Sequence, residues 1–281
     1  MGEHRFLVGL IGSGVGPSLT PALHMRAADR LGLAYIYRTV ELGTEDVSEL
    51  LRMAEVLGFD ALNITHPVKT RVLPYLDELD DLATELGSVN TVLLREGRRL
   101  GRNTDWTGFT RSFRAGLPDV PLGCVALVGA GGAGMSVGHA LLTLGVRRLR
   151  IVDVRPDRAH TLADRLAGLF PASEVTAIET GQLGPDPDGF VHCTPTGMAA
   201  RPGLPFDPGL LQPRHWVADI VYRPLQTELL RTAAARGCRT LNGSGMTVHQ
   251  ALETFTLITG RTPDAAAMTE HFRELVATET A

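Results

Sequence analysis

The side chains most suited to chemistry lie in four short polar strings, each near the end of a stretch predicted to be a strand. The strings are Ser18 to Thr20, Asn63 to Lys69, Gly87 to Thr91 and Asn103 to Asp105. In an open α/β sheet the carboxyl ends of the strands face the ligand crevice, so these hydroxyls, amides, ammonium and carboxylate would converge there. Such a set would suit a small polyhydroxylated acid.

Each of these residues also has an ordinary structural role open to it. Ser18, Thr20 and Asp105 could cap helices, Asn90 could occupy a turn, and Lys69 could be a solvated side chain. For any one residue, the structural interpretation is at least as good. The functional interpretation gains weight because the strings occur together.

Lys69 is distinctive because it is the only lysine among the 27 Lys and Arg residues of the chain. An arginine keeps its proton near neutral pH, whereas the environment can shift a lysine until it exchanges one. The chain therefore retains an exchangeable ammonium at a single position, although drift in an arginine-biased composition would leave the same pattern.

A glycine-rich loop indicates a second binding function. Val125 to Val128 predicts a strand buried on both faces, and Gly129-Ala130-Gly131-Gly132-Ala133-Gly134 then opens an apolar helical run. Glycines allow a tight turn and close backbone approach to a pyrophosphate at the helix N-terminus. A second apolar run ends in Asp153, about 20 residues further on, where such folds hold the adenosine ribose. The pattern predicts dinucleotide binding; a glycine-rich turn of another α/β protein and a methyltransferase loop are the alternatives.

Apolar spacing predicts alternating strands and helices on both sides of a hinge at Gly116 to Pro121. Expected strands are 6–11, 35–40, 61–64, 124–128, 149–152, 175–178, 189–192 and 216–220, with a hairpin over 89–102. Expected helices include one capped by Thr20 with an apolar stripe at Leu23, Ala27 and Leu31, one over 47–57, and two near the end at about 246–259 and 264–277. This alternation predicts two open α/β domains with mainly parallel sheets, the second of Rossmann type.

Composition further narrows the classes of partner and the cell compartment that we expect. The net charge of −4 is mild and no basic patch is visible, so we expect no nucleic-acid partner. No apolar run reaches the roughly 18 residues of a membrane span, so no membrane partner is expected either. Cys124, Cys193 and Cys238 are widely spaced, which favours buried free thiols in a reducing compartment. Because Phe6 already begins a strand-like segment, we expect a cytoplasmic protein.

Taken in order, the motifs resemble the shikimate dehydrogenase family over nearly the whole chain. The family's Ser-x-Ser/Thr-Pro-x-x-His corresponds to residues 18–24, its Asn-Val-Thr-x-Pro-x-Lys to 63–69 with Ile64 for Val, and its Gly-Ala-Val-Asn-Thr to 87–91 with Ser88 for Ala. Asn-Thr-Asp at 103–105 and Gly-Ala-Gly-Gly-Ala at 129–133 also match. Further matches are Cys193 to Met198, Asp219 to Tyr222, and Gly243 to Met246 with Gln250.

The resemblance implies an NAD(P)-dependent oxidoreductase that converts the 3-hydroxyl of quinate or shikimate to a ketone. It implies that Lys69 and Asp105 form the acid/base pair on the reacting hydroxyl, and it implies no metal. The implied substrate-binding residues are Ser18, Thr20, Thr65, Lys69, Asn90, Asp105, Tyr222 and Gln250. The implied cofactor-binding residues are Gly129, Ala130, Gly131, Gly132, Ala133, Asp153, Arg158, Thr194, Pro195, Met198, Val221, Gly245 and Met246.

Two departures from the commonest family pattern bear on specificity. Thr20 stands where most biosynthetic members have Ser, and in this it resembles the quinate/shikimate dehydrogenases. NADP-dependent members carry Asn-Arg-Thr after the second strand of the dinucleotide domain, whereas this chain has Asp153-Val154-Arg155. Because a carboxylate repels a 2′-phosphate and accepts hydrogen bonds from a 2′-hydroxyl, NAD is favoured over NADP. Arg155, one position later, is the feature that argues against a preference for NAD.

We therefore expect an NAD-dependent quinate/shikimate dehydrogenase with a substrate domain at 1–105, completed by helices at 246–281, and a Rossmann domain at 106–245. One alternative is a biosynthetic dehydrogenase that prefers shikimate or aminoshikimate. Another is a non-catalytic sensor of the same acids, against which the intact Lys69 and Asp105 argue. The expected partner is a small polyhydroxylated cyclic carboxylic acid, and the chain is expected to be a monomer or a homodimer.

Overall fold

The computed structural model describes residues 5–42 and 46–279, which divide into two compact units. Unit 1 comprises the chain up to Thr104 together with the chain from Val248, and unit 2 comprises Asp105–Thr247. Each unit holds one α/β sheet, so the expected two-domain α/β fold with mainly parallel sheets is confirmed. The finer assignment of 1–105 with 246–281 to the substrate and 106–245 to the cofactor stays a prediction.

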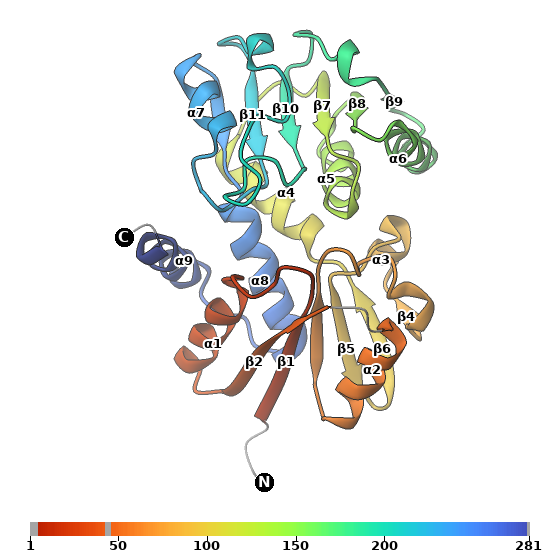
Figure 1. The fold of residues 1–281 in the computed structure, drawn as a ribbon, viewed down its shortest axis with the longest axis vertical. Coiled ribbons are helices and arrows are strands. Elements are labelled where there is room, and N and C mark those ends of the chain that lie inside the picture. The colour runs from red at the N-terminus through yellow and green to blue at the C-terminus, as the bar shows by residue number, and fades with distance from the viewer. Residues whose placement is uncertain (1–4, 43–45, 280–281) are drawn as a thin grey trace. The chain divides into compact units, whose positions relative to one another are not determined.

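Unit 1 is built on a six-stranded sheet with the order β2-β1-β3-β5-β6-β4 (Figure 1). Its strands are β1 (Arg5–Gly12), β2 (Ala34–Glu41), β3 (Ala61–Ile64), β4 (Glu78–Leu79), β5 (Thr91–Arg95) and β6 (Arg98–Arg102). Its helices are α1 (Thr20–Arg30), α2 (Val47–Val56), the 3-10 turn η1 (Leu73–Tyr75), α3 (Asp81–Leu86), α9 (Ala265–Glu279) and the later part of α8 (Ser244–Thr259). The expected hairpin is present, since β5 and β6 pair antiparallel, while β1 runs parallel to β2 and β3.

Helix α1 differs in two details from the helix expected from the sequence. Leu19 rather than Thr20 is the N-cap residue, and no side chain caps the helix among the described residues; Thr20 is instead the first helical residue. The stripe ends one turn early, because Leu31 lies at the C-cap and is 40 % exposed, while Leu23 and Ala27 are buried. A residue beyond the last helical turn no longer follows the 3.6-residue period that would bring it back to the core.

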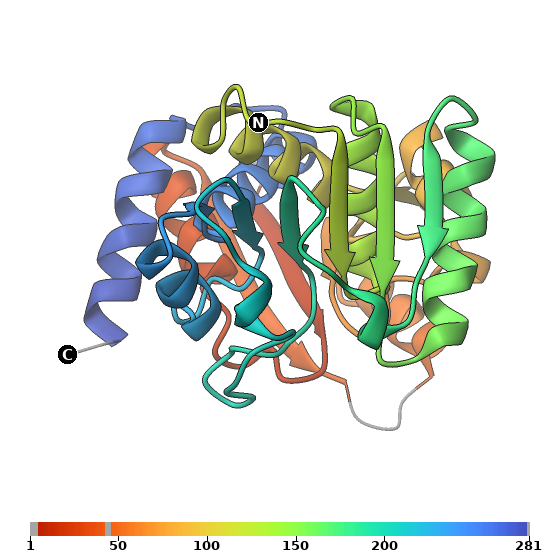
Figure 2. The ribbon, with the colours of Figure 1, turned by 90° about the horizontal axis from the view of Figure 1, so that it is seen from above.

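Unit 2 is built on a second six-stranded sheet with the order β12-β11-β10-β7-β8-β9, in which every pair is parallel. Its strands are β7 (Cys124–Val128), β8 (Arg148–Val152), β9 (Glu174–Ala177), β10 (Gly189–His192), β11 (Trp216–Asp219) and β12 (Arg239–Leu241). Its helices are α4 (Asp105–Gly116), α5 (Gly132–Thr143), α6 (Pro156–Leu169) and α7 (Glu228–Ala235), with 3-10 turns η2 (Thr180–Gln182) and η3 (Pro208–Leu210). Figure 2 shows α6 alongside β9 at one edge of this sheet.

The strand order of unit 2 is that of the Rossmann fold, in which the third strand lies at one edge and the first and fourth are neighbours. Here β7 lies between β8 and β10, so the direction in which strands are added reverses at β7. All residues of β7, β10 and β11 are buried, as expected for parallel strands covered on both faces. The order therefore places the loops after β7 and β10 at the switch point where this fold binds ligands.

Two further findings concern the state of the cysteines and the search for a membrane-spanning helix. All three cysteines, Cys124, Cys193 and Cys238, are buried and free, as expected. Burial raises the pKa of the Cys193 thiol well above its ordinary value, so this thiol is protonated and unreactive at neutral pH. Within residues 5–42 and 46–279, no helix is long and apolar enough to cross a membrane.

Candidate active site

The loop after β7 has the geometry that the glycine pattern predicts. Gly129 has φ +110°, and its N–H donates to the carbonyl of Val152 at 2.7 Å. A Cβ on Gly134 would lie 2.1 Å from the carbonyl oxygen of Gly129, so only glycine allows the loop to fold back on the first turn of α5. Gly131 is the N-cap of α5 and has nothing within 4 Å of a built Cβ. The space beside Gly131 is therefore open, and an anion could approach the first N–H groups of α5 there.

Asp153, at the end of β8, lies beside this loop. Its Oδ2 accepts a hydrogen bond from the N–H of Ala130 at 2.8 Å, and its Oδ1 accepts one from the N–H of Arg155 at 2.9 Å. Val154 is 89 % exposed and offers no charge. The Arg155 guanidinium bonds Asp157 at 2.8 Å, an exposed pair on the surface. The region that follows β8 thus presents a fixed carboxylate and an apolar side chain, and the arginine nearest to them already has a carboxylate partner.

The loop after β10 is tied to the sheet by a buried chain of hydrogen bonds. His192 Nδ1 lies 2.9 Å from Asp219 Oδ1, and His192 Nε2 lies 2.5 Å from Thr194 Oγ1. Asp219 also accepts from the Thr227 hydroxyl at 2.7 Å and from the Val221 N–H at 2.9 Å. Because the Asp219 carboxylate can only accept, His192 Nδ1 donates to it, and His192 Nε2 is left to bond the Thr194 hydroxyl.

Thr194 is thereby held against the glycine-rich loop. A Cβ on Gly129 would lie 2.8 Å from Thr194 Cγ2 and 2.9 Å from the carbonyl carbon of Cys193. Thr194 Oγ1 also accepts from the N–H of Thr196 at 3.2 Å. The structure therefore brings together the loops after β7 and β10, which carry most of the predicted cofactor-binding residues.

The other predicted cofactor-binding residues lie in three places in unit 2. Pro195 and Met198 lie in the turn after β10, where the Met198 N–H donates to the Pro195 carbonyl at 3.2 Å, and Met198 is 41 % exposed. Arg158 is an exposed residue of the first turn of α6. Val221 follows β11, and its carbonyl accepts from the N–H of Gly243 at 3.3 Å, beside the start of α8 that carries Gly245 and Met246.

In unit 1, Ser18 and Thr20 form a hydroxyl pair at the start of α1. Ser18 Oγ donates to Thr20 Oγ1 at 3.2 Å and accepts from the Thr20 N–H at 3.3 Å. Since Ser18 directs its proton to Thr20, the Thr20 hydroxyl is the outward donor of this pair. The pair therefore offers a neutral hydroxyl donor at a helix N-terminus, an arrangement that suits a carboxylate.

Lys69 lies in the turns that follow β3, and its backbone is fixed to the Gly87–Thr91 segment. The Lys69 carbonyl accepts from the N–H of Val89 at 2.9 Å. Thr65, at the start of these turns, donates its N–H to the carbonyl of Ile11 at 2.9 Å. A Cβ on Gly12 would lie 2.3 Å from Thr65 Cγ2, so the glycine at the end of β1 lets Thr65 approach. Two of the four polar strings are thus adjacent in unit 1.

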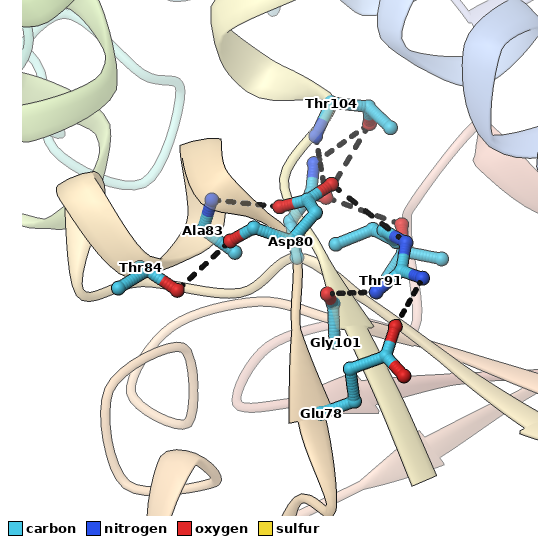
Figure 3. A network of polar contacts seen from close by, with 9 residues as sticks. Glu78, Asp80, Ala83, Thr84, Thr91, Gly101 and Thr104 are labelled. Carbon is cyan, nitrogen blue, oxygen red and sulfur yellow. Dashed lines mark hydrogen bonds and ion pairs between the residues drawn. The ribbon is translucent and has the colours of Figure 1, made fainter.

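The Gly87–Thr91 segment is held from several directions, as Figure 3 shows in part. Gly87 ends α3 in the left-handed region with φ 55°, and the side chain of Asn103 donates to the Ser88 carbonyl at 2.8 Å. The Asn90 N–H donates to the carbonyl of Arg102 at 3.1 Å. Asn90 is only 4 % exposed and accepts the Thr104 N–H at Oδ1 at 2.9 Å, so it is a fixed buried amide rather than an ordinary turn residue.

A buried aromatic cluster supports this region from the other side. His24 lies with its ring centroid 5.1 Å from that of Tyr37, and the Tyr37 hydroxyl donates to Asn63 Oδ1. The side-chain amide of Asn63 donates to the Asn90 carbonyl at 3.3 Å and to Thr91 Oγ1 at 3.2 Å. Burial lowers the pKa of His24 to about 3, so the imidazole is neutral at working pH. His24 therefore supports this region as an uncharged side chain.

Three predicted site residues are placed by elements that the sequence also predicted. Asp105 is the first residue of α4 and is 6 % exposed in unit 2. Tyr222 follows β11 in the same unit and is partly buried. Gln250 lies on α8 in unit 1 and is partly buried. Sequence reasoning did not single out His192 or Thr254 as functional residues, although His192 directly precedes the quoted Cys193 motif and Thr254 lies one helical turn after Gln250.

Comparison with known proteins assigns the family. Residues 10–92 match the model of the shikimate dehydrogenase substrate binding domain, and residues 243–271 match that of the shikimate 5′-dehydrogenase C-terminal domain. The chain is 54 % identical to a shikimate dehydrogenase (NADP⁺) of Arthrobacter sp. (strain FB24) over 98 % of this chain and 96 % of that protein. It is 44 % identical to a quinate/shikimate dehydrogenase (NAD⁺) of Corynebacterium efficiens over 98 % of this chain and all (100 %) of that protein. The quinate dehydrogenase of Corynebacterium glutamicum in complex with NAD superposes with a TM-score of 0.91, at 44 % identity, over 96 % of this chain and 99 % of that one.

The fold and these relatives define an NAD(P)-dependent oxidoreductase that acts on CH–OH groups. The chain belongs to the shikimate dehydrogenase family, as its sequence motifs indicate. The glycine loop fits the dinucleotide, because its backbone has the left-handed turn and the Cβ-free surface that close approach of a pyrophosphate requires. Among the described residues, no group of three or more His, Cys, Asp or Glu side chains could hold a metal ion.

Proposed function

We propose that the protein is an NAD-preferring quinate/shikimate dehydrogenase, which reversibly oxidises the 3-hydroxyl of the acid to a ketone. The preference for NAD rests on one observation, the position of the Asp153 carboxylate on the N–H of Ala130 in the glycine-rich loop. A carboxylate held there accepts hydrogen bonds from a ribose 2′-hydroxyl and repels a 2′-phosphate. Val154, 89 % exposed, supplies no positive charge to offset that repulsion.

Lys69 is the proposed acid/base. When bound, the nicotinamide ring accepts the hydride that leaves the carbon of the reacting hydroxyl. As the C=O bond forms, the hydroxyl proton moves to Nζ of Lys69, and in the reverse direction Lys69 returns it. Asp105 is proposed to orient the ammonium and to stabilise its charged form. The Lys69 carbonyl accepts the N–H of Val89 at 2.9 Å, so the backbone from which the side chain extends is held in place. This supports the role proposed for Lys69.

The other predicted substrate residues have binding roles in this proposal. Ser18 and Thr20 bind the carboxylate of the acid at the start of α1, with Thr20 as the outward hydroxyl donor, and Tyr222 adds a second hydroxyl. Asn90 and Thr65 hold ring hydroxyls, and Gln250 closes the far side. These neutral donors provide affinity that does not depend on proton transfer, so losing Lys69 should affect turnover more than binding.

A second candidate function is that of an NADP-dependent shikimate dehydrogenase, favoured by the 54 % identical relative of that name. It requires a positive group for the 2′-phosphate. Arg155 is the nearest in sequence, and its guanidinium bonds Asp157 at 2.8 Å. Since both side chains are mostly exposed, this ion pair is weak, and a phosphate could compete for the arginine.

The assay that separates the candidates measures kcat/KM for quinate and shikimate, each with NAD and with NADP. The proposal predicts a preference for NAD with either acid and measurable oxidation of quinate. A preference for NADP together with activity on shikimate alone would replace the proposal with the second candidate. An absence of turnover in all four combinations would instead favour a sensor of the acid. The buried free thiols support a reducing, cytoplasmic setting, so the assay should include a thiol reductant.

A further inference from the structure

Four buried side chains of unit 1 form a closed ring of hydrogen bonds. Thr254 Oγ1, on α8, lies 3.2 Å from Thr91 Oγ1 and 2.9 Å from Thr104 Oγ1. Asn90 completes the ring, with Oδ1 3.1 Å from Thr91 Oγ1 and Nδ2 2.9 Å from Thr104 Oγ1. None of the four residues is more than 4 % exposed. Figure 3 shows the part of the ring around Thr91 and Thr104.

The direction of every proton in the ring follows from its partners. The backbone N–H of Thr104 donates to Asn90 Oδ1 at 2.9 Å, which fixes which end of the amide is the oxygen. Thr91 therefore spends its only proton on Asn90 Oδ1, so Thr254 must donate to Thr91. Thr104 Oγ1 lies 2.9 Å from Thr254 Oγ1 and 3.4 Å from Asn90 Oδ1, so it donates along the shorter contact to Thr254, and it accepts from Asn90 Nδ2. All four hydrogen bonds run in one direction, an arrangement in which each bond strengthens the next.

Thr254 is the one member of the ring that comes from a distant part of the chain. Thr91 and Thr104 flank the β5–β6 hairpin, whereas Thr254 lies 163 and 150 residues away from them on α8. On the same helix Gln250 precedes Thr254 by four residues, so the two lie on one face. The hydroxyl of Thr254 thus ties the helix that carries Gln250 to the amide of Asn90.

We propose that Thr254 is a positioning residue for the substrate acid. Its hydroxyl holds the Asn90 amide in the orientation that binds the ring hydroxyls, and it fixes α8 so that Gln250 meets the same substrate. This inference rests on the proposed function. It assigns to Thr254 no contact with the acid and no part in proton transfer.

The test compares Thr254→Val with Thr256→Val. Valine keeps the shape of threonine and removes the hydroxyl in both variants. The Thr256 hydroxyl donates only one turn back along the same helix, to the Leu252 carbonyl at 2.9 Å, and is the matched control. Thr254→Val removes both hydrogen bonds of the hydroxyl, and we expect KM for the acid to rise about tenfold, which corresponds to about 1.4 kcal/mol. KM for the dinucleotide should stay within about twofold, and Thr254→Ser should restore most of the affinity.

A rise in KM for the acid without a rise in KM for the dinucleotide distinguishes a positioning role from a merely structural one. Equal acid KM values for Thr254→Val and Thr256→Val would overturn the inference, and so would equal increases in both KM values of Thr254→Val. If Thr254→Val does not fold, Thr254→Ala and Thr254→Ser provide a second pair differing by one oxygen atom; a higher acid KM for Ala supports the inference, and equal values overturn it. Inactivity of the unmutated protein on both acids would overturn the proposed function instead.

Discussion

The replacement His192→Phe tests whether the chain from Asp219 to Thr194 holds the cofactor loop. Phenylalanine keeps a planar ring but removes both nitrogen atoms, so Asp219 loses one of the three donors described above and the Thr194 hydroxyl loses its bond to Nε2. A hydrogen bond to a buried charge contributes about 1.5–3 kcal/mol, and the partly exposed Thr194 hydroxyl adds about 0.5–1 kcal/mol. We therefore expect the free energy of unfolding to fall by about 2–4 kcal/mol in urea titrations.

The same variant should weaken dinucleotide binding specifically. With the loop after β10 released from the glycine-rich loop, we expect KM for the dinucleotide to rise about tenfold or more while KM for the acid changes little. His215→Phe is the control, because His215 is a buried histidine of the same unit that bonds only Gln212 and Pro185. It should lower stability and leave the dinucleotide KM unchanged. A destabilisation of His192→Phe below 1 kcal/mol, or equal KM values in the two variants, would refute the reasoning.

Three further predictions follow from other parts of the structure. Replacing Asp153 by Ser and Val154 by Arg should move the ratio of kcat/KM for NAD over NADP towards NADP by tenfold or more, and an unchanged ratio would contradict the role given to the carboxylate. His24, whose pKa burial lowers from 6.5 to about 3, charges in the unfolded chain first, so stability falls as pH drops from 6.5 towards 3; at pH 5.5 the loss is about 1.4 kcal/mol in urea titrations, and His24→Phe should lack this component. Gly134→Ala should lower the melting temperature, since its Cβ would lie 2.1 Å from a backbone oxygen, whereas Gly131→Ala, with nothing within 4 Å, should retain it in differential scanning fluorimetry.

The repeating elements of the fold could be predicted from the sequence because they depend on local periodicity. The strands 124–128 and 189–192 agree with β7 and β10 residue for residue: β7 is uniformly apolar, and each strand directly follows a polar residue or a glycine. Helix ends were less predictable. Thr20 is a residue type that often caps helices, but it is already helical, and its own N–H donates to Ser18 Oγ two residues earlier. A residue type suited to capping therefore does not fix where a helix begins, because that also depends on the conformation of the residues before it.

The supports of the candidate site could not be predicted in the same way. Lys69, Asn90 and the glycine loop belong to short motifs, so their residue types and spacing made them candidates. Thr254 and His192 act only through partners far along the chain, and a threonine or histidine has no local pattern that reveals such a partner. A polar residue at helical spacing from a predicted ligand, as Thr254 is from Gln250, was the only signal the sequence offered.

The turnover of Lys69→Arg tests most directly whether Lys69 is the proton acceptor. Arginine keeps the positive charge and the hydrogen-bond donors but cannot release its proton near neutral pH. We expect kcat for oxidation of quinate or shikimate to fall by about 10²–10⁴-fold, the usual effect of losing a positioned acid/base, with a much smaller change in KM for the acid. A kcat within a few fold of the unmutated enzyme would contradict the account and leave Lys69 as a charge that only holds the substrate.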